Sequence, residues 1–264
     1  MHHPPGGPSK RARTLLFPLS QKTAPYIDTH TQACVRAQRK LSLKGNRLVR
    51  ALILLSGGID SAIALYLTKQ ETDDVYSMNM IYTQTYDSEA EASKKLAAAA
   101  QVKEHLSVYL PFFKDIETRY RPTPSSEVSS AYVPARNIVF YGVAAAYAEA
   151  IGAHEIVFGS NADDAMELPD ARPEFIQLMN ELIRTGTRSG REGTEMKIVN
   201  PLIHYTKVEV LRLALKLKVP LELTWSCYED LPVPCGKCRG CRTREKAFGE
   251  VGILDPLNAS SQPK

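Results

Sequence analysis

The sequence has no long apolar run, although 44% of its 264 residues are hydrophobic. No stretch approaches the ~20 consecutive apolar residues that cross a bilayer, so we expect no membrane-spanning helix. The first eight residues also lack the apolar centre of a secretory signal peptide. These two absences predict a cytoplasmic protein.

Acidic residues are scarce near the N-terminus. Residues 1–50 carry ten Lys or Arg against the single acid Asp28, which gives this part a net charge of +9. The net charge of the whole chain is +4, so the remaining residues sum to −5. Proline, glycine and polar residues dominate the first thirty positions, which predicts a flexible basic arm over residues 1–47. Such an arm suits contact with nucleic acid or an acidic partner. The alternatives are a solvated tail and an extension from an upstream start codon.

The glycine-containing run at residues 56–61 is not a Walker loop, because no Gly-Lys-Ser/Thr closes it. It reads Ser-Gly-Gly-Ile-Asp-Ser and lies between the apolar residues 51–55 and a helical pattern from residue 62. Glycines let the backbone approach an anion, and the N–H groups of a helix start face it. The run is the signature of the pyrophosphatase-loop ATPases, which cleave ATP between its α and β phosphates. The expected nucleotide-binding residues are Ser56, Gly57, Gly58, Asp60 and Ser61.

Apolar runs and helical patterns alternate after the arm, which predicts an α/β fold with a doubly wound parallel sheet. Strands are expected at residues 51–55, 75–82, 105–110 and 155–159. Helices are expected at residues 60–70, 88–102, 135–151, 173–184 and 206–218. Residues 111–131 are expected to form a long loop that serves as an active-site flap. Ligands of open α/β sheets sit beyond the carboxyl ends of the strands, where three polar segments fall: 56–61, 83–89 and 160–170.

Four of the five cysteines fall within fifteen residues, at Cys227, Cys235, Cys238 and Cys241. This spacing suits a closed tetrahedral zinc site, and glycines beside the cysteines allow tight turns. A disulfide does not fit a cytoplasmic chain. An iron–sulfur cluster is the competing interpretation, because Cys-x2-Cys-x2-Cys also ligates clusters. We favour Zn²⁺ in a folding role, since four cysteines leave no open position for a substrate.

The loop and the cysteines together make the chain resemble the 7-cyano-7-deazaguanine synthases, the nitrile-forming enzymes of queuosine and archaeosine biosynthesis. The likeness runs in the expected order over about residues 50–250, and further matching stretches are 132–140, 169–175, 200–202, 224–228 and 235–241. It implies a Rossmann-like fold of the adenine nucleotide alpha hydrolase type with a small C-terminal four-Cys zinc module. The implied division is 1–47 arm, 48–222 nucleotide-binding domain, 223–250 zinc knuckle and 251–264 tail.

The resemblance implies an ATP-dependent ligase acting on 7-carboxy-7-deazaguanine. The carboxylate attacks the α-phosphate of ATP, ammonia displaces AMP to give an amide, and a second ATP converts the amide to the nitrile. ATP and Mg²⁺ are the implied cofactors beside Zn²⁺, and the family suggests a homodimer. The implied catalytic residues are Asp60, Arg136, Lys207 and Asp164. The implied substrate-binding residues are Asp164, Asp170 and Arg172.

Several of these roles stay open at the level of sequence. Asp60 is either a helix cap or a Mg²⁺ ligand. Arg136 and Lys207 are expected to clamp phosphate charge, against the alternatives of a surface helix charge and a solvated lysine. An aspartate of the substrate group serves either as a base for the incoming amine or as a ligand to the guanidine-like edge.

Two stretches depart from the family pattern at the strand ends where substrate is expected. Residues 82–86 read Tyr-Thr-Gln-Thr-Tyr where the family has Tyr-Gly-Gln-Arg/Lys-His, and residues 165–168 read Ala-Met-Glu-Leu where it has an aromatic residue and Ser-Gly-Tyr. The loss of hydrogen-bond donors from a substrate-binding pocket strongly changes how the pocket discriminates between substrates. The departures leave three alternatives: acyl transfer to an amine of a protein, as in synthase-like proteins of antiphage operons; tRNA modification with the arm as RNA contact; and a nucleotide-binding scaffold without turnover.

Overall fold

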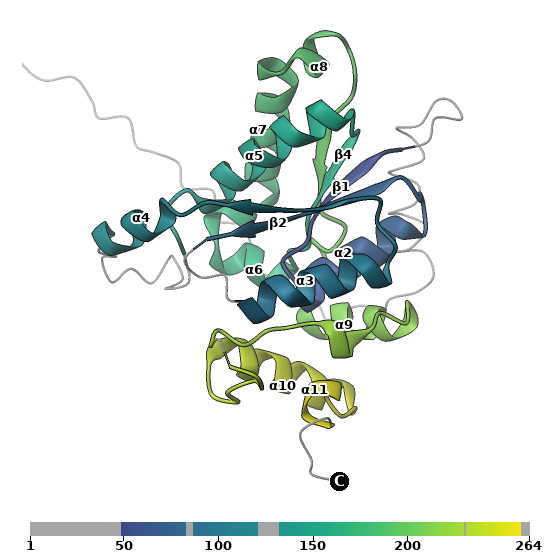
Figure 1. The fold of residues 1–264 in the computed structure, drawn as a ribbon, viewed down its shortest axis with the longest axis vertical. Helices are drawn as coiled ribbons and strands as arrows, with labels where there is room; N and C mark the ends of the chain where they lie inside the picture. The colour runs from purple at the N-terminus through teal and green to yellow at the C-terminus, as the bar shows by residue number, and fades with distance from the viewer. Residues whose placement is uncertain (1–48, 83–86, 121–131, 230, 260–264) are drawn as a thin grey trace, which may run out of the picture. The chain divides into compact units, whose positions relative to one another are not determined.

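A computed structural model describes residues 49–82, 87–120, 132–229 and 231–259 (Figure 1). Contacts divide the chain after Gly45, and the described residues all belong to the second unit, Asn46–Lys264. The predicted basic arm and its role lie outside the described residues, as do residues 83–86 and most of the predicted flap. Every helix and strand of the described residues therefore lies in the second unit.

Five parallel strands form one sheet in the order β3-β2-β1-β4-β5. The strands are β1 (Ala51–Leu54), β2 (Val75–Ile81), β3 (His105–Tyr109), β4 (Glu155–Val157) and β5 (Lys197–Val199). Leu52 of β1 lies opposite Tyr76 on one side and Ile156 on the other. The strand order therefore reverses between β1 and β4, which is where doubly wound sheets bind ligands. The predicted doubly wound parallel sheet is confirmed.

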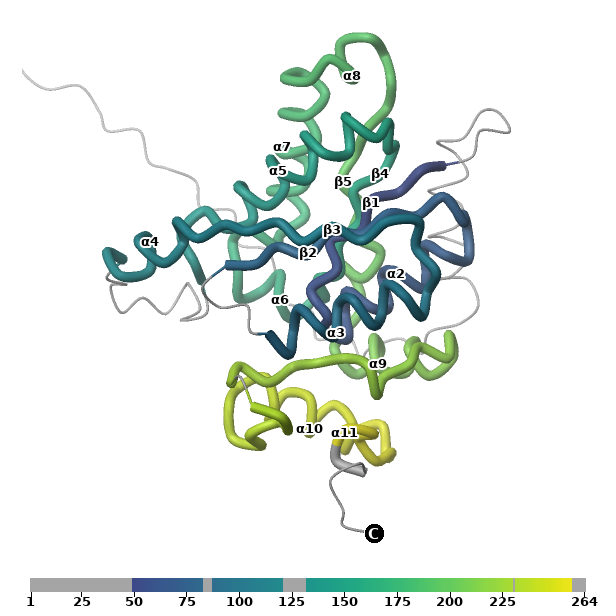
Figure 2. Tube along the Cα trace, in the orientation of Figure 1, coloured from purple at the N-terminus to yellow at the C-terminus, as the bar shows by residue number. Residues whose placement is uncertain are grey.

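Helices cover both faces of the sheet (Figures 1 and 2). One face carries α2 (Ile59–Lys69), α3 (Asp87–Ala99) and α9 (Lys207–Lys216), and the other carries α5 (Arg136–Ile151) and α7 (Pro173–Gly186). Alternate strand residues point to opposite faces: Ile53 and Val157 pack in the first core, and Leu52 and Ile156 pack in the second. Because both faces are covered, the strands are apolar on both sides.

Two segments that were predicted as loops contain helices. In the first, α4 (Phe113–Arg119) forms because the Phe113 ring is fully buried and holds the segment against the sheet. In the second, α6 (Ala162–Glu167) begins with a capping box between Asn161 and Asp164, followed by a 3-10 turn, η1 (Pro169–Ala171). The short strand β5 was not predicted, since three residues are too few for a periodic pattern.

The C-terminal residues pack against the helical layer that contains α2, α3 and α9. The remaining elements are α8 (Arg188–Arg191), η2 (Leu221–Leu223), α10 (Arg239–Val251) and α11 (Pro256–Ala259). Phe248 of α10 belongs to the same core as Val210 of α9. The Arg244 guanidinium is buried and donates to Asp255 Oδ2 at 2.6 Å and to Thr224 Oγ1 at 2.7 Å. The cysteine-bearing segment is thus fixed to the body of the fold.

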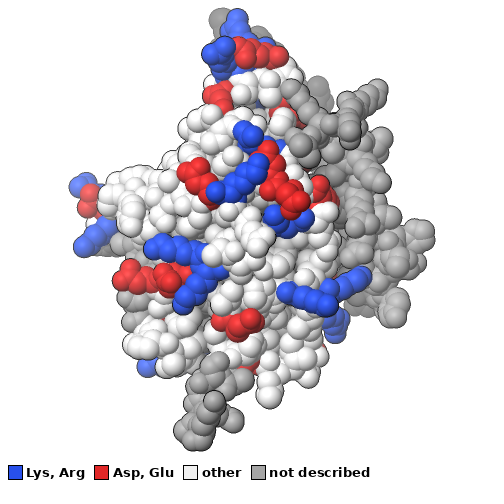
Figure 3. All heavy atoms as spheres, turned by 45° about the vertical axis from the view of Figure 1, so that its right-hand side comes forward, with Lys and Arg blue, Asp and Glu red and all other residues white. Residues whose placement is uncertain are grey.

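Charges of both signs share the surface. On the face drawn in Figure 3, Lys and Arg side chains lie among Asp and Glu, with wide uncharged areas between them. That face presents no continuous basic stripe in the part of the chain that the structure describes. Within the same residues, no helix combines the length and apolarity that crossing a bilayer requires.

Candidate active site

The loop after β1 is held in place by two close backbone approaches that only glycine allows. Gly57 has φ +96°, and a Cβ there would lie 2.5 Å from the carbonyl oxygen of Glu89. At the end of β4, a Cβ on Gly159 would lie 2.4 Å from the carbonyl oxygen of Asp60. The loop is therefore pressed between the start of α3 and the end of β4, at the point where the strand order reverses.

The two serines of the loop brace it from within. Ser61 Oγ donates to the carbonyl of Gly58 at 3.0 Å and lies 3.2 Å from Ser56 Oγ, which accepts the N–H of Gly58 at 3.3 Å. Gly58 is the N-cap of α2, and no side chain among the described residues caps this helix start. Its first-turn N–H groups and the positive end of the helix dipole suit an anion such as a phosphate.

Asp60 and Lys207 form an ion pair beside this loop. Lys207 Nζ donates to Asp60 Oδ2 at 2.6 Å, and Asn161 Nδ2 donates to the same oxygen at 3.4 Å. Asp60 does not cap α2, because the helix begins one residue earlier and its carboxylate faces these partners. Asp60 Oδ1 is buried and has no hydrogen-bond partner in the described part of the chain. A buried carboxylate oxygen without a donor fits a hard cation such as Mg²⁺.

Asp164 lies near Asp60 but has a partner of its own. Its Oδ2 accepts the N–H of Asn161 at 3.0 Å, which completes the capping box of α6. Burial raises the pKa of Asp164, the negative charge of Asp60 raises it further, and the Asn161 N–H and Lys207 oppose the rise. Lys207 N also donates to Asp163 Oδ2 at 3.1 Å, so the starts of α6 and α9 are joined around Asp60.

A second polar cluster surrounds Arg136 at the start of α5. Arg136 Nη1 donates to the Tyr82 hydroxyl at 3.0 Å, and its guanidinium lies 5.7 Å from the centre of that ring. The next residue, Asn137, donates its Nδ2 to the carbonyl of Asp170 at 3.0 Å and its N–H to Asp170 Oδ2 at 3.4 Å. Ala135 precedes them at φ 54°, a strained conformation that fixes the direction of the helix start.

Asp170 is the buried anion of this cluster. Its Oδ1 is inaccessible and has no hydrogen-bond partner among the described residues. Burial raises the pKa of Asp170, and the positive charge of Arg136 opposes the rise. By contrast, Arg172 is exposed at the N-cap of α7, and within the described residues no hydrogen bond or ion pair joins its side chain to either cluster.

Glu89 is a charged residue of this region for which the sequence predicted no individual role. It lies in the first turn of α3 and is half-buried. Burial raises the pKa of Glu89 to about 7, and Arg136 opposes the rise. Burial raises the pKa of the Tyr228 phenol, and the negative charges of Glu89 and Asp164 add to the rise. Glu89 is the last residue of the polar segment 83–89 predicted at a strand end, and an acid at that position is the signal that could have identified it.

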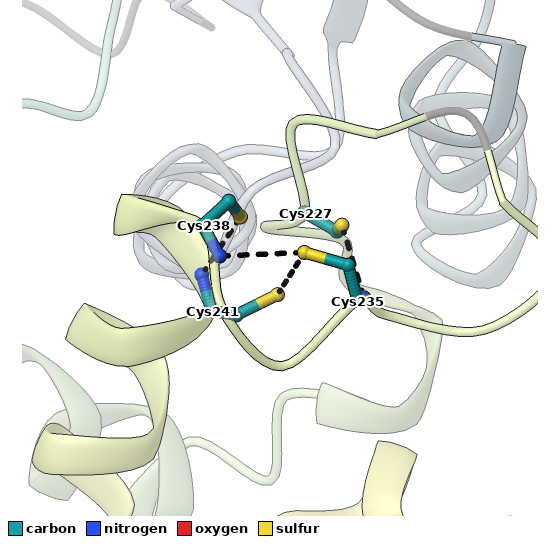
Figure 4. Close-up of side chains that lie close together, drawn as sticks. All are labelled: Cys227, Cys235, Cys238 and Cys241. Atoms are coloured by element: carbon teal, nitrogen blue, oxygen red, sulfur yellow. Dashed lines mark hydrogen bonds between the residues drawn. The ribbon is translucent and has the colours of Figure 1, made fainter.

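The four cysteines converge as their spacing predicted (Figure 4). All four Sγ atoms lie within 4.8 Å of one another. Main-chain N–H groups donate to sulfur at 3.3–3.4 Å, including those of Cys235 to Cys227, Cys238 to Cys235 and Cys241 to Cys238. Such donors stabilise thiolates, and the four convergent sulfurs fit a tetrahedral metal ion. Backbone N–H groups lower the pKa of Cys235 to about 6.

Two curated proteins that are similar to this chain in sequence carry the same name. Residues 50–252 match the family model described as "Queuosine biosynthesis protein QueC". A 7-cyano-7-deazaguanine synthase of Thermosynechococcus vestitus is 40% identical over 231 residues, which cover 81% of this chain and 97% of that protein. The Nostoc punctiforme synthase is 39% identical over 221 residues, covering 79% and 99%. Among solved structures, an NH3-dependent NAD synthetase of Campylobacter jejuni matches with a TM-score of 0.49, 16% identity and coverage of 89% and 92%.

Proposed function

Since the chain belongs to the QueC family of queuosine biosynthesis proteins, we propose that it is an ATP-dependent ligase that converts 7-carboxy-7-deazaguanine to 7-cyano-7-deazaguanine. The observation that carries this proposal is the Asp60–Lys207 pair, placed beside an uncapped helix start at the reversal point of the sheet. This arrangement puts a cation and an unsatisfied carboxylate oxygen next to a phosphate cradle.

The first step is adenylation of the substrate carboxylate. The α2 N–H groups and the hydroxyls of Ser56 and Ser61 bind the outer phosphates of ATP, and a carboxylate oxygen displaces pyrophosphate at the α-phosphorus. Asp60 Oδ1 would hold Mg²⁺, which neutralises charge on the phosphates when bound. Lys207, already oriented by Asp60, supplies a fixed positive charge for the phosphoryl oxygens.

The later steps introduce nitrogen. Ammonia displaces AMP from the acyl adenylate to give the amide, and a second ATP activates the amide oxygen so that AMP leaves with it and the nitrile remains. Asp170 Oδ1, an acceptor without a donor, suits the N–H groups of the guanidine-like edge of the deazaguanine. Arg136 balances its charge, and Arg172 remains a predicted substrate ligand.

The cysteine cluster has a structural role in this proposal. Four thiolates close the coordination sphere of Zn²⁺, so no position is left for a substrate. Cys227, Cys235, Cys238 and Cys241 would hold this ion. A homodimer is the predicted assembly of the family.

Product analysis tests the proposal. The protein is incubated with ATP, Mg²⁺ and 7-carboxy-7-deazaguanine, with and without ammonium, and the products are identified by mass spectrometry. We expect AMP, pyrophosphate and the nitrile with ammonium. An acyl adenylate or amide that goes no further contradicts the nitrile product and supports the alternative of a different amine acceptor. Absence of AMP and pyrophosphate in every mixture contradicts adenylation itself.

A further inference from the structure

A buried serine of α3 holds the residue that precedes the loop after β1, residues 56–61. Ser93 is fully buried, and its Oγ donates to the carbonyl of Leu55 at 2.7 Å. Leu55 is itself inaccessible and lies between the end of β1 and Ser56. The main-chain N of Ser93 is also an atom that a Cβ on Gly57 would meet, at 3.0 Å. The same residue of α3 therefore contacts the chain on both sides of Ser56.

The hydroxyl of Ser93 has a second neighbour, His105, which begins the outer strand β3. His105 Nε2 lies 3.4 Å from Ser93 Oγ, and His105 Nδ1 lies 2.8 Å from Ser77 Oγ. Ser77 is the residue of β2 directly opposite His105 in the sheet. Three side chains therefore link the outer pair of strands, through α3, to the carbonyl of Leu55 at the end of β1.

The acceptors of this chain of hydrogen bonds determine where its protons lie. A serine hydroxyl has one proton, and that of Ser93 goes to the Leu55 carbonyl, so Ser93 Oγ accepts from His105. Nε2 of His105 therefore carries hydrogen, and in the neutral ring Nδ1 accepts from the Ser77 hydroxyl. Burial lowers the pKa of His105 and the positive charge of Lys94 lowers it further, which keeps the ring neutral at pH 7. Every hydrogen bond of the chain then points toward the loop.

We infer that His105 is a positioning residue for ATP: it orients the Ser93 hydroxyl, which fixes the Leu55 carbonyl and with it the direction in which residues 56–61 leave the sheet. The inference rests on the proposed binding of the ATP phosphates by this loop. The loop N–H groups stabilise developing charge only if they are already aimed at the phosphate oxygens, and a small displacement is costly. Buried, satisfied hydrogen-bond networks are suited to this task because they specify a single arrangement.

The test compares two replacements of His105 that differ in the donor they keep. The amide nitrogen of glutamine reaches the place of Nε2, whereas that of asparagine, one carbon shorter, reaches only the place of Nδ1. His105→Gln therefore keeps a donor for Ser93, and His105→Asn loses it. Ser93→Ala removes the link itself. Thr68→Val is the matched control, because Thr68 is also buried and donates to a main-chain carbonyl, that of Ala64 at 2.9 Å, but in the last turn of α2.

ATP–pyrophosphate exchange with the carboxylate substrate gives a KM for each substrate, and urea unfolding gives the stability of each variant. For Ser93→Ala and His105→Asn we expect the KM for ATP to rise about tenfold, with the KM for the carboxylate substrate within about twofold of the parent. His105→Gln should stay close to the parent. The double variant Ser93→Ala/His105→Asn should be no worse than Ser93→Ala, because both changes break one chain. Thr68→Val should lose stability and keep the parental KM for ATP.

A role confined to stability predicts a different pattern. Variants of Ser93 and His105 that are less stable but keep the parental KM for ATP would overturn the inference, and so would equal KM values for His105→Gln and His105→Asn. Failure of the parent protein to exchange pyrophosphate would instead refute the proposed adenylation. The Kd for ATP of the same variants, measured by calorimetry, would then still decide the role of His105, so the two failures are distinguishable.

Discussion

The main-chain N–H of Trp225 donates a hydrogen bond to the carbonyl of Gly57 at 2.9 Å. This bond joins the loop after β1, residues 56–61, to the residues directly before Cys227. On the other side, a Cβ on Gly240 would lie 1.9 Å from the carbonyl oxygen of Ser226, so the cysteine turns and this segment are in backbone contact. The cysteine-bearing segment therefore supports the loop through backbone contacts. Disorder in the cysteine cluster should destabilise the conformation of the loop.

Loss of the metal should weaken nucleotide binding. We expect one Zn²⁺ per chain, and we expect Cys235→Ser to lose the metal and to raise the Kd for ATP, because the Trp225 segment no longer supports Gly57. Metal analysis and calorimetry measure the two effects. Cys34→Ser is the control, since this fifth cysteine lies almost two hundred positions before the other four in the sequence. Iron with sulfide would refute the zinc assignment, and unchanged ATP affinity without metal would refute the coupling.

A methyl group on Gly57 should damage activity far more than one on Gly142. At Gly57 it would lie 2.5 Å from the Glu89 carbonyl and 3.0 Å from the Ser93 N–H, at a positive φ. A displaced loop should lower pyrophosphate release by about 10²-fold. Gly142 is exposed within α5 and a Cβ there meets nothing within 4 Å, so Gly142→Ala should stabilise the protein by about 0.5–1 kcal/mol. Similar activities of the two variants would contradict this role of Gly57.

Arg244 should be essential for stability and not for chemistry. Its guanidinium donates to both carboxylate oxygens of Asp255, at 2.6 and 2.9 Å, and to the carbonyl of Leu221 at 3.1 Å. Arg244→Met leaves Asp255 buried without its partner, and we expect a loss of about 3–5 kcal/mol in the free energy of unfolding. The double variant Arg244→Met/Asp255→Leu should recover part of the lost free energy of unfolding, because no buried charge is left unpaired. A double variant less stable than the single one would contradict this explanation.

The pH dependence of stability should contain a contribution from Glu89. Its pKa is about 7 in the folded protein against 4.5 ordinarily, so the folded state holds the proton more tightly. The stability it contributes is present below about pH 4.5 and is lost as the pH rises to about 7. Glu89→Gln should flatten this fall in the nucleotide-free protein, as measured by urea unfolding at a series of pH values. Parallel curves for variant and parent would refute the raised pKa.

Sequence patterns predicted the sheet and the cysteine cluster because both depend on local signals. The strands are apolar runs, the phosphate loop is a continuous motif, and the cysteines lie within fifteen residues. The helices α4 and α6 were missed because their causes are not periodic. Helix α4 depends on the burial of the Phe113 ring, and α6 depends on the capping box at Asn161. Hydrophobic periodicity in the sequence reveals neither contact.

Hydrogen bonds between residues far apart in the chain also could not be predicted from the sequence. Lys207 was identified from the family pattern, but its bond to Asp60 joins residues 147 positions apart. The hydrogen bond from Arg136 to Tyr82 likewise joins residues 54 positions apart, and the contact of Arg136 with the phosphates stays a prediction. Glu89 carried no motif of its own, and its significance comes from burial beside Arg136.

The origin of the oxygen in AMP tests the central claim most directly. The substrate carboxylate is labelled with ¹⁸O in both positions, and the AMP released with ATP, Mg²⁺ and ammonium is analysed by mass spectrometry. If the carboxylate and then the amide oxygen attack the α-phosphorus, every AMP carries one ¹⁸O, and two AMP form for each nitrile. Unlabelled AMP, or label recovered in ADP or inorganic phosphate, would contradict adenylation as the chemistry of this site.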